Sequence, residues 1–262
     1  MFENIRNQEQ IIREAKLFGN GAHIFVPKAW IGQDVVLIRR HESLKEKIIN
    51  ILTPYLDNII GVYLYGSNAR GEAESNSDVD LFIITNKKSK MKKEGFGIIS
   101  LKESEIEKAV EQEPLLIYSV LQEAKTIINP SLLEKLRDRY RITKRDVKEF
   151  VKSTTEMVKK EEELIKLDER TDGIASSELI YSLILRLRGI FIIKCLLSNK
   201  IYSHLNFKNW IVDSGIEKDI YDKAYKAYKL VKVGDKYKKN INILEARKIL
   251  DLLKKEIAKF KR

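Results

Sequence analysis

The pattern of apolar and polar positions divides the chain into parts with different character. Within residues 41–130, short apolar runs stand between turn residues, which predicts strands at 62–65, 81–84 and 96–101. From residue 131 onward apolar positions recur at helical spacing, with few turn signals between them. The pattern predicts an α+β domain followed by an all-α bundle.

Helices are expected in both parts. An apolar stripe over 42–57 predicts an amphipathic helix that leads into the first strand. Residues 115–121 fit a helix that runs into a short strand near residue 127, and a strand over 115–121 is a second interpretation. Residues 176–197 are apolar on most faces, so we expect them to form the central helix of the bundle. Ser131 is the expected N-cap of the first helix in the C-terminal half.

The first 40 residues carry turn and strand signals of their own. A turn signal at Gly19–Gly21 stands before two apolar runs, 22–26 and 35–38, that predict strands. We therefore expect three domains: a small β-hairpin unit over 1–40, an α+β domain over 41–130 and a helical bundle over 131–262.

Candidate chemistry gathers around the turn between the first two strands of the α+β domain. Asp78 and Asp80 stand at the start of the second strand, and residues at i and i+2 of a strand point to the same side. Two carboxylates held so close repel each other unless a cation lies between them. Mg²⁺ is usually bound by one or two carboxylates together with phosphate oxygens. The pair therefore predicts a magnesium site.

A Gly-Ser turn, Gly66 and Ser67, precedes this pair. Glycine lets the backbone approach a phosphate, and the free N–H groups of a following helix favour anions. Phosphate contacts and metal ligands are thus expected on adjacent strands, which suits phosphoryl or nucleotidyl transfer.

These residues carry a family resemblance. The run Gly66-Ser67-x-x-Arg70-Gly71, followed by Ser77-Asp78-x-Asp80-Leu81, resembles the signature of the DNA polymerase β-like nucleotidyltransferase superfamily, in particular its minimal and kanamycin-nucleotidyltransferase-like branch. The resemblance implies a mixed sheet with helices. It also implies Mg²⁺-dependent transfer of a nucleoside monophosphate from an NTP to an acceptor hydroxyl. Asp78 and Asp80 would be the catalytic metal ligands. The implied nucleotide-binding residues are Gly66, Ser67, Arg70 and Ser77, where Arg70 either neutralises phosphate charge or braces the loop.

The chain departs from this family at the third carboxylate. Catalytic members usually place it on the strand next to the paired aspartates, but neither 96–101 nor 115–121 contains an acid. Three glutamates flank these segments: Glu94, Glu103 and Glu113. The alternative function is a catalytically weak or inactive, antitoxin-like or regulatory protein that acts on a partner protein or DNA. Glu178 in the bundle is the candidate general base for a catalytic chain.

The N-terminal unit carries a second resemblance. It resembles half of an AbrB-like swapped-hairpin fold in Gly19, Asn20, Ala22, Pro27, Lys28, Trp30, Ile31 and Gly32. This implies completion by a second copy, hence a homodimer, and DNA binding. A hairpin that packs on the catalytic domain is the other interpretation.

Charge is distributed unevenly. Residues 1–130 hold 17 Lys+Arg and 18 Asp+Glu, whereas residues 131–262 hold 32 and 20, a net charge of +12. A cationic aminoglycoside would call for a carboxylate-lined site, so the charge favours a polyanionic acceptor such as tRNA or another RNA. A lysine-rich solvated helical surface is the other interpretation. The helical half also resembles HEPN proteins, but no Arg stands four to six residues before His204, so ribonuclease activity is not supported.

Cysteine content and hydropathy limit the remaining classes. The single cysteine, Cys195, excludes an internal disulfide, and the apolar runs are too short to span a membrane. The chain opens without a basic-then-apolar leader. We expect a cytoplasmic protein with no membrane partner.

Overall fold

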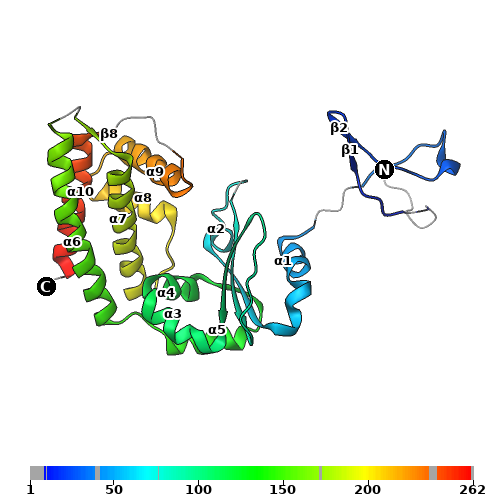
Figure 1. Cartoon of the computed structure of the whole chain (residues 1–262), viewed down its shortest axis with the longest axis horizontal. Helices are drawn as coiled ribbons and strands as arrows, with labels where there is room; N and C mark the ends of the chain where they lie inside the picture. Colours follow the sequence, from blue (N-terminus) through cyan, green and yellow to red (C-terminus); the bar gives the residue numbers. More distant parts are fainter. Residues whose placement is uncertain are drawn as a thin grey trace. The chain divides into compact units, whose positions relative to one another are not determined.

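The computed structural model describes residues 9, 11–38, 42–75, 77–170, 173–235 and 241–260. The chain divides into two compact units, Met1–Glu46 and Lys47–Arg262, which we describe separately (Figure 1).

The first unit contains one β-hairpin. Strands β1 (Lys16–Phe18) and β2 (Gly21–His23) pair antiparallel across the predicted turn, and Gly19 adopts a positive φ of 53°. A short 3-10 helix, Lys28–Trp30, follows. The predicted strand over 35–38 is wrong, because these residues have no regular structure and are exposed. The prediction failed because a strand needs a partner for its backbone groups, and the described part of this unit provides none for 35–38.

The second unit is built on a mixed four-stranded sheet, as predicted. Its strand order is β5-β4-β3-β6, where β3 runs antiparallel to β4 and β6, and β4 runs parallel to β5. The strands are β3 (Ile59–Tyr65), β4 (Val79–Thr85), β5 (Phe96–Lys102) and β6 (Lys125–Ile128). Leu81, Phe82, Ile83 and Ile84 are fully buried in β4. The apolar run that predicted this strand therefore forms the centre of the sheet's core.

Short helices surround the sheet. They are α1 (Leu44–Leu52), α2 (Gly66–Arg70), α3 (Ile106–Gln112), α4 (Pro114–Glu123) and α5 (Pro130–Arg139), with 3-10 segments at Thr53–Asn58 and Glu103–Glu105. Residues 115–121 are helical, so the strand interpretation of them is wrong. The expected cap at Ser131 is also wrong, because Asn129 Oδ1 accepts the Leu132 N–H at 3.1 Å instead. Asn129 tolerates the positive φ of 65° found there, so the helix can begin earlier.

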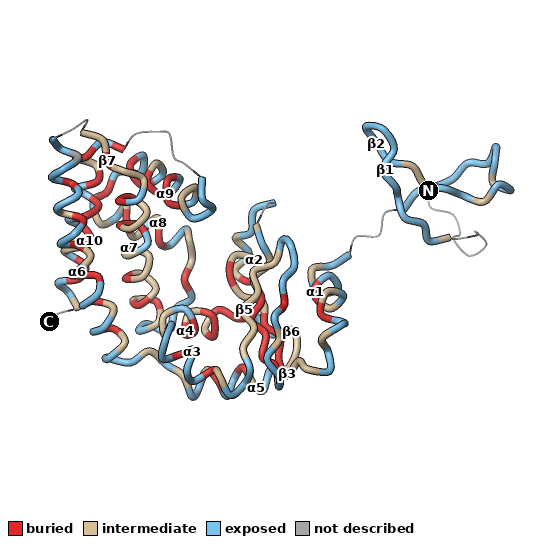
Figure 2. The backbone as a smooth tube through the Cα atoms, viewed as in Figure 1, coloured by how far each residue is buried: buried red, intermediate tan, exposed pale blue. Residues whose placement is uncertain are grey.

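The C-terminal half forms the predicted helical bundle. Its helices are α6 (Lys144–Asp168), α7 (Ser177–Leu197), α8 (His204–Asp213), α9 (Lys218–Lys232) and α10 (Ile243–Phe260). Two-residue strands β7 (Ile174–Ala175) and β8 (Ile241–Asn242) pair antiparallel. Helix α7 is central, with Leu183, Leu187 and Ile190 fully buried (Figure 2). No helix in the described ranges is both long and apolar enough to cross a bilayer.

Candidate active site

Asp80 lies between Gly97 of β5 and Gly66, the residue that directly follows β3 and begins α2. In the strand register Asp80 is opposite Tyr65 of β3 and Gly97 of β5. A Cβ atom added at Gly66 would lie 2.1 Å from Asp80 Oδ2, and one added at Gly97 would lie 2.5 Å from Oδ1. Gly66 also has a positive φ of 72°. Both positions therefore require glycine, and the space they leave is taken by the Asp80 carboxylate.

The surroundings of Asp80 disfavour its ionised form. Burial raises the pKa of Asp80, and the neighbouring charges of Asp78 and Glu123 raise it further, while Lys232 and Arg70 act in the opposite direction. A bound cation would relieve this repulsion between carboxylates.

Asp78 stands at the edge of the same strand, where it is exposed to solvent. The side-chain amide of Asn68 on α2 donates to the Asp78 backbone carbonyl at 2.9 Å, which fixes the loop at this point. Over the described residues, no group of three or more His, Cys, Asp or Glu side chains could hold a metal. Asp78 and Asp80 offer carboxylate oxygens, which are ligands of the kind that Mg²⁺ accepts.

Glu123, which sequence reasoning missed, contacts two of the predicted nucleotide-binding residues. It ends α4 and is 8% exposed. Its Oε1 accepts the Gly66 N–H at 2.9 Å, and its Oε2 accepts Arg70 Nη1 at 2.6 Å. An acid among the buried positions of an apolar helix, directly before a strand, is the sequence signal that could have found it.

Arg70 is held by a second carboxylate. Its Nε donates to Glu72 Oε2 at 2.9 Å, so two glutamates contact one guanidinium. The charge of Arg70 is thus already balanced within the protein. Of the two roles considered for this residue, the contacts favour bracing the loop.

Ser67 and Ser77 occupy different positions around the turn. Ser67 lies within α2, and its carbonyl accepts the Glu72 N–H at 2.9 Å. Ser77 Oγ accepts the Glu74 N–H at 2.8 Å, and Ser77 N–H donates to the Glu74 carbonyl. Ser77 thereby closes the loop that leads to Asp78.

The helical bundle contacts this loop directly. Glu72 Oε1 accepts the backbone N–H of His204, the first residue of α8, at 2.9 Å. Although burial acts to raise it, the pKa of Glu72 is lowered by hydrogen bonds from Arg70, Ser203 and His204. Lys229 of α9 lies 3.5 Å from Glu74. A hydrogen bond and an ion pair therefore join the bundle to the loop that follows α2.

An arginine of the bundle contacts the same aromatic ring as Arg70. Arg188 on α7 lies 5.1 Å from the centre of the Tyr202 ring, and Arg70 lies 5.2 Å from the same ring. Arg188 Nη1 donates to Tyr228 Oη at 3.1 Å, and no carboxylate in the described part of the chain pairs with it. Burial acts to lower the pKa of Arg188, but Tyr202 and Tyr228 outweigh it, so the group stays charged.

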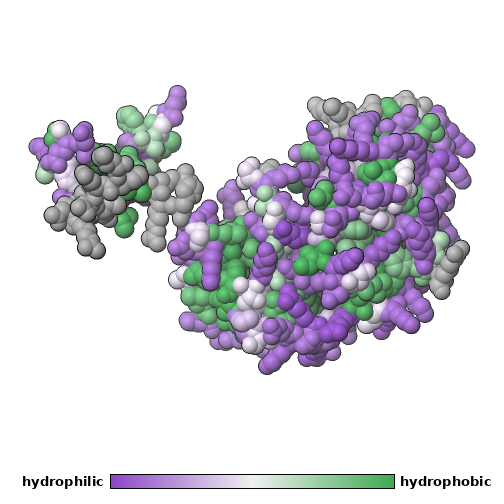
Figure 3. Space-filling model, turned by 180° about the vertical axis from the view of Figure 1, so that it is seen from behind, coloured by the Kyte–Doolittle hydropathy of each residue, from purple (hydrophilic) through white to green (hydrophobic). Residues whose placement is uncertain are grey.

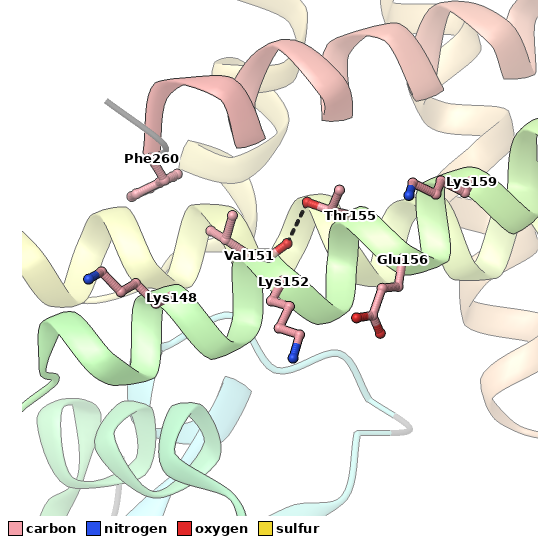
Figure 4. A pocket seen from close by; sticks show the side chains of 7 residues that line it. All are labelled: Lys148, Val151, Lys152, Thr155, Glu156, Lys159 and Phe260. Carbon is pink, nitrogen blue, oxygen red and sulfur yellow. Dashed lines mark hydrogen bonds between the residues drawn. The ribbon is translucent and has the colours of Figure 1, made fainter.

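Other residues singled out from the sequence lie elsewhere. Glu178, the candidate base, is exposed and bonds the adjacent Ser177 hydroxyl. It is not among the charges that act on Asp80. A groove of about 480 Å³ is lined by Lys148, Val151, Lys152, Thr155, Glu156, Lys159 and Phe260 (Figure 4). It contains none of the predicted site residues.

Comparison with known proteins places the turn and the aspartates in a recognised domain. The chain is similar to the spectinomycin adenyltransferase AAD(9) from Enterococcus faecialis, whose crystal structure was solved with ATP and spectinomycin. The identity is 19%, the match covers 79% of this chain and 97% of that one, and the TM-score is 0.41. No curated protein sequence matches the chain. Residues 46–133 match the family model described as Polymerase beta, Nucleotidyltransferase, and this stretch is a nucleotidyltransferase domain of the polymerase β type.

Proposed function

We propose that this protein is a Mg²⁺-dependent nucleotidyltransferase that moves a nucleoside monophosphate from an NTP to an acceptor hydroxyl. The observation that carries the proposal is the seating of Asp80 between Gly66 and Gly97, next to Asp78, within a nucleotidyltransferase domain. Two glycines that exist to accommodate one carboxylate indicate a carboxylate with a task other than folding.

Asp78 and Asp80 would hold the metal ion. When bound, Mg²⁺ supplies the positive charge that draws the triphosphate and the acceptor oxygen together and stabilises the charge of the leaving pyrophosphate. The chain's own contribution is to fix Asp80 within a sheet strand and Asp78 at its start, where the Asn68 contact restrains the backbone.

Arg188 is the group best suited to contact the triphosphate from the bundle. A partly buried guanidinium without a carboxylate partner calls for an anion. Lys232, whose charge lowers the pKa of Asp80, adds a second cation on the same side. Ser67 would supply the contacts of the turn, since Gly66 N–H and Arg70 are occupied by Glu123.

RNA is the proposed class of acceptor. The net charge of +12 in residues 131–262 would attract a polyanion, and RNA carries the hydroxyls that the reaction requires. Lys148, Lys152 and Lys159 line one groove of the bundle, and no carboxylate in the described ranges pairs with them. They are the first lysines to test for phosphate contacts.

A regulatory protein that binds nucleotide without turnover is the second candidate. Catalytic members of this family usually carry a third carboxylate on the strand next to the paired aspartates, but on β5 the residue opposite Asp80 is Gly97. Because a Cβ at this position would collide with Asp80, the chain cannot restore that ligand without moving Asp80.

One experiment separates the two candidates. The protein is incubated with each α-labelled NTP, Mg²⁺ and either tRNA or cell extract, while calorimetry measures binding of non-hydrolysable NTP analogues. Turnover and binding that both disappear in the Asp78→Asn/Asp80→Asn variant would support the enzyme. Binding without turnover would favour the regulator, and equal binding in wild type and variant would contradict both.

A second experiment tests the RNA acceptor. RNA affinity should fall by roughly one log unit per log of salt concentration for each phosphate contacted. An RNA affinity that is negligible even at low salt would exclude RNA as the acceptor.

A further inference from the structure

Glu123 is a buried carboxylate that the proposed reaction does not use. It lies 57 positions from Gly66 in the chain, yet it accepts that residue's N–H, and its second oxygen accepts the Arg70 guanidinium. Burying an ionised carboxylate is costly unless both oxygens are satisfied. Here a backbone amide and a guanidinium satisfy one oxygen each, so the carboxylate is fully committed to the turn.

The hydrogen bonds of Glu123 matter because the chain otherwise lacks a third carboxylate at the site. Glu123 is close enough to Asp80 for its charge to raise the pKa of Asp80, but over the described residues no group of three acidic side chains is arranged to hold a metal. Its hydrogen bonds indicate a different role. A cation bound to Glu123 would weaken its 2.6 Å ion pair with Arg70, because two positive charges would then compete for one carboxylate.

The contacts of Glu123 continue into the helical bundle. Arg70 also binds Glu72, and Glu72 accepts the first amide of α8. Helix α4, helix α2 and the start of α8 are therefore joined through one continuous set of hydrogen bonds. Asp80 lies against the other side of Gly66, since a Cβ on that glycine would collide with its carboxylate.

We propose that Glu123 is a positioning residue: it holds the Gly66–Ser67 turn against Asp80 and, through Arg70 and Glu72, ties the turn to α8. It acts on nucleotide binding through the turn and does not bind the metal. For its nucleotide readout the inference rests on the proposed function, because it assumes that the turn contacts the triphosphate.

Three variants test the role. Glu123→Gln keeps an acceptor for the Gly66 N–H but loses the charge that Arg70 requires, and Glu123→Ala removes both. Glu113→Gln, at the exposed N-terminal end of the same helix, is the matched control. Three quantities are measured: Mn²⁺ affinity by electron paramagnetic resonance, NTP-analogue affinity at saturating Mn²⁺ by calorimetry, and amide hydrogen exchange over residues 65–71.

The expected result separates the metal from the nucleotide. Mn²⁺ affinity should stay within about twofold in Glu123→Gln, while NTP affinity falls roughly tenfold, a loss comparable to one charge-assisted hydrogen bond. In Glu123→Ala the NTP affinity should fall further, and exchange at residue 66 should accelerate because its amide loses its acceptor. Glu113→Gln should match the wild type in all three measurements.

Several outcomes would overturn the inference. A tenfold loss of Mn²⁺ affinity in Glu123→Gln would make Glu123 a metal ligand. Unchanged NTP affinity would remove its positioning role, and tighter NTP binding would make it an internal competitor of the phosphates. If the wild type binds no NTP, the proposed function fails, and the exchange measurement still decides whether Glu123 braces the turn. Unaltered exchange at residue 66 in Glu123→Ala would show that it does not.

Discussion

The two compact units differ in whether their large apolar side chains are buried. In Met1–Glu46 none of the described residues is buried, and Leu17, Phe18 and Phe25 are 86%, 72% and 70% exposed. In Lys47–Arg262 leucine, isoleucine and aromatic side chains fill two large clusters, one beside the sheet and one in the bundle. Figure 3 shows apolar side chains at the surface of the small unit. The difference follows from chain length, because so short a segment cannot enclose a core of its own.

This difference in burial affects how firmly the candidate site residues are held in position. Asp80 extends from a strand whose next four residues are fully buried, so the sheet's core fixes its position. The N-terminal unit has no equivalent support among its described residues. Its exposed apolar side chains instead form a surface of the kind that marks association. We propose that a second copy of this chain covers that surface.

The largest expected effect is the loss of self-association on removing residues 1–40. Light scattering should give a dimer for the full-length protein and a monomer for the shortened one, while NTP binding persists, because the site residues all belong to the second unit. A milder variant, Leu17→Ser/Phe18→Ser, should weaken the dimer without shortening the chain. A full-length protein that is monomeric at high concentration would contradict the proposal.

The sequence predicts those elements whose signals are local. The apolar runs of β3 and β4 and the apolar character of α7 each depend on neighbouring residues, and the structure contains these elements. The predicted Gly66–Ser67 turn is instead the start of helix α2, which begins two residues earlier than expected. The predicted strand at 35–38 failed although its composition is suitable, because pairing depends on a partner that composition does not reveal.

Contacts between residues that are far apart in the chain could not be predicted from the sequence. Glu123 and Gly66 are 57 positions apart, and Arg188 and Tyr228 are 40 apart. No periodicity relates such positions. The closeness of Gly97 to Asp80 likewise became visible only with the register of β4 and β5. The candidate ligands could thus be read from one motif, but not the residues that position them.

A second prediction compares one leucine from each unit. Leu187→Ala, at a fully buried position of α7, should lower the free energy of unfolding by about 2–5 kcal/mol, because it removes apolar contacts and leaves a cavity. Leu17→Ala should leave the unfolding of the bundle unchanged. Urea unfolding followed by Trp210 fluorescence, in a Trp30→Phe background, reports on the bundle alone. An equal loss in Leu17→Ala would mean that this side chain supports a core, and the contrast between the units would fail.

The smallest expected effect concerns a charge that the second unit buries. Glu256 on α10 is 1% exposed and pairs with Lys194 of α7 and with Lys259. Burial acts to raise the pKa of Glu256, but the two lysines outweigh it and lower the pKa below its ordinary value. A carboxylate whose pKa is lowered on folding stabilises the folded protein above its ordinary pKa. That contribution is lost as the pH falls through the lowered pKa.

Glu256→Gln should therefore destabilise the protein by about 1–3 kcal/mol at neutral pH, the range for a hydrogen bond to a charged group. The difference from wild type should shrink as the pH is lowered through the carboxylate range, because the wild-type side chain then also becomes neutral. Glu149→Gln, which breaks an exposed i,i+4 pair with Arg145, is the control and should destabilise the protein much less than Glu256→Gln does. Chemical denaturation at a series of pH values measures both variants. A constant difference between Glu256→Gln and wild type across the series would mean that Glu256 acts through its shape and packing, and that its charge adds nothing to the stability of the bundle.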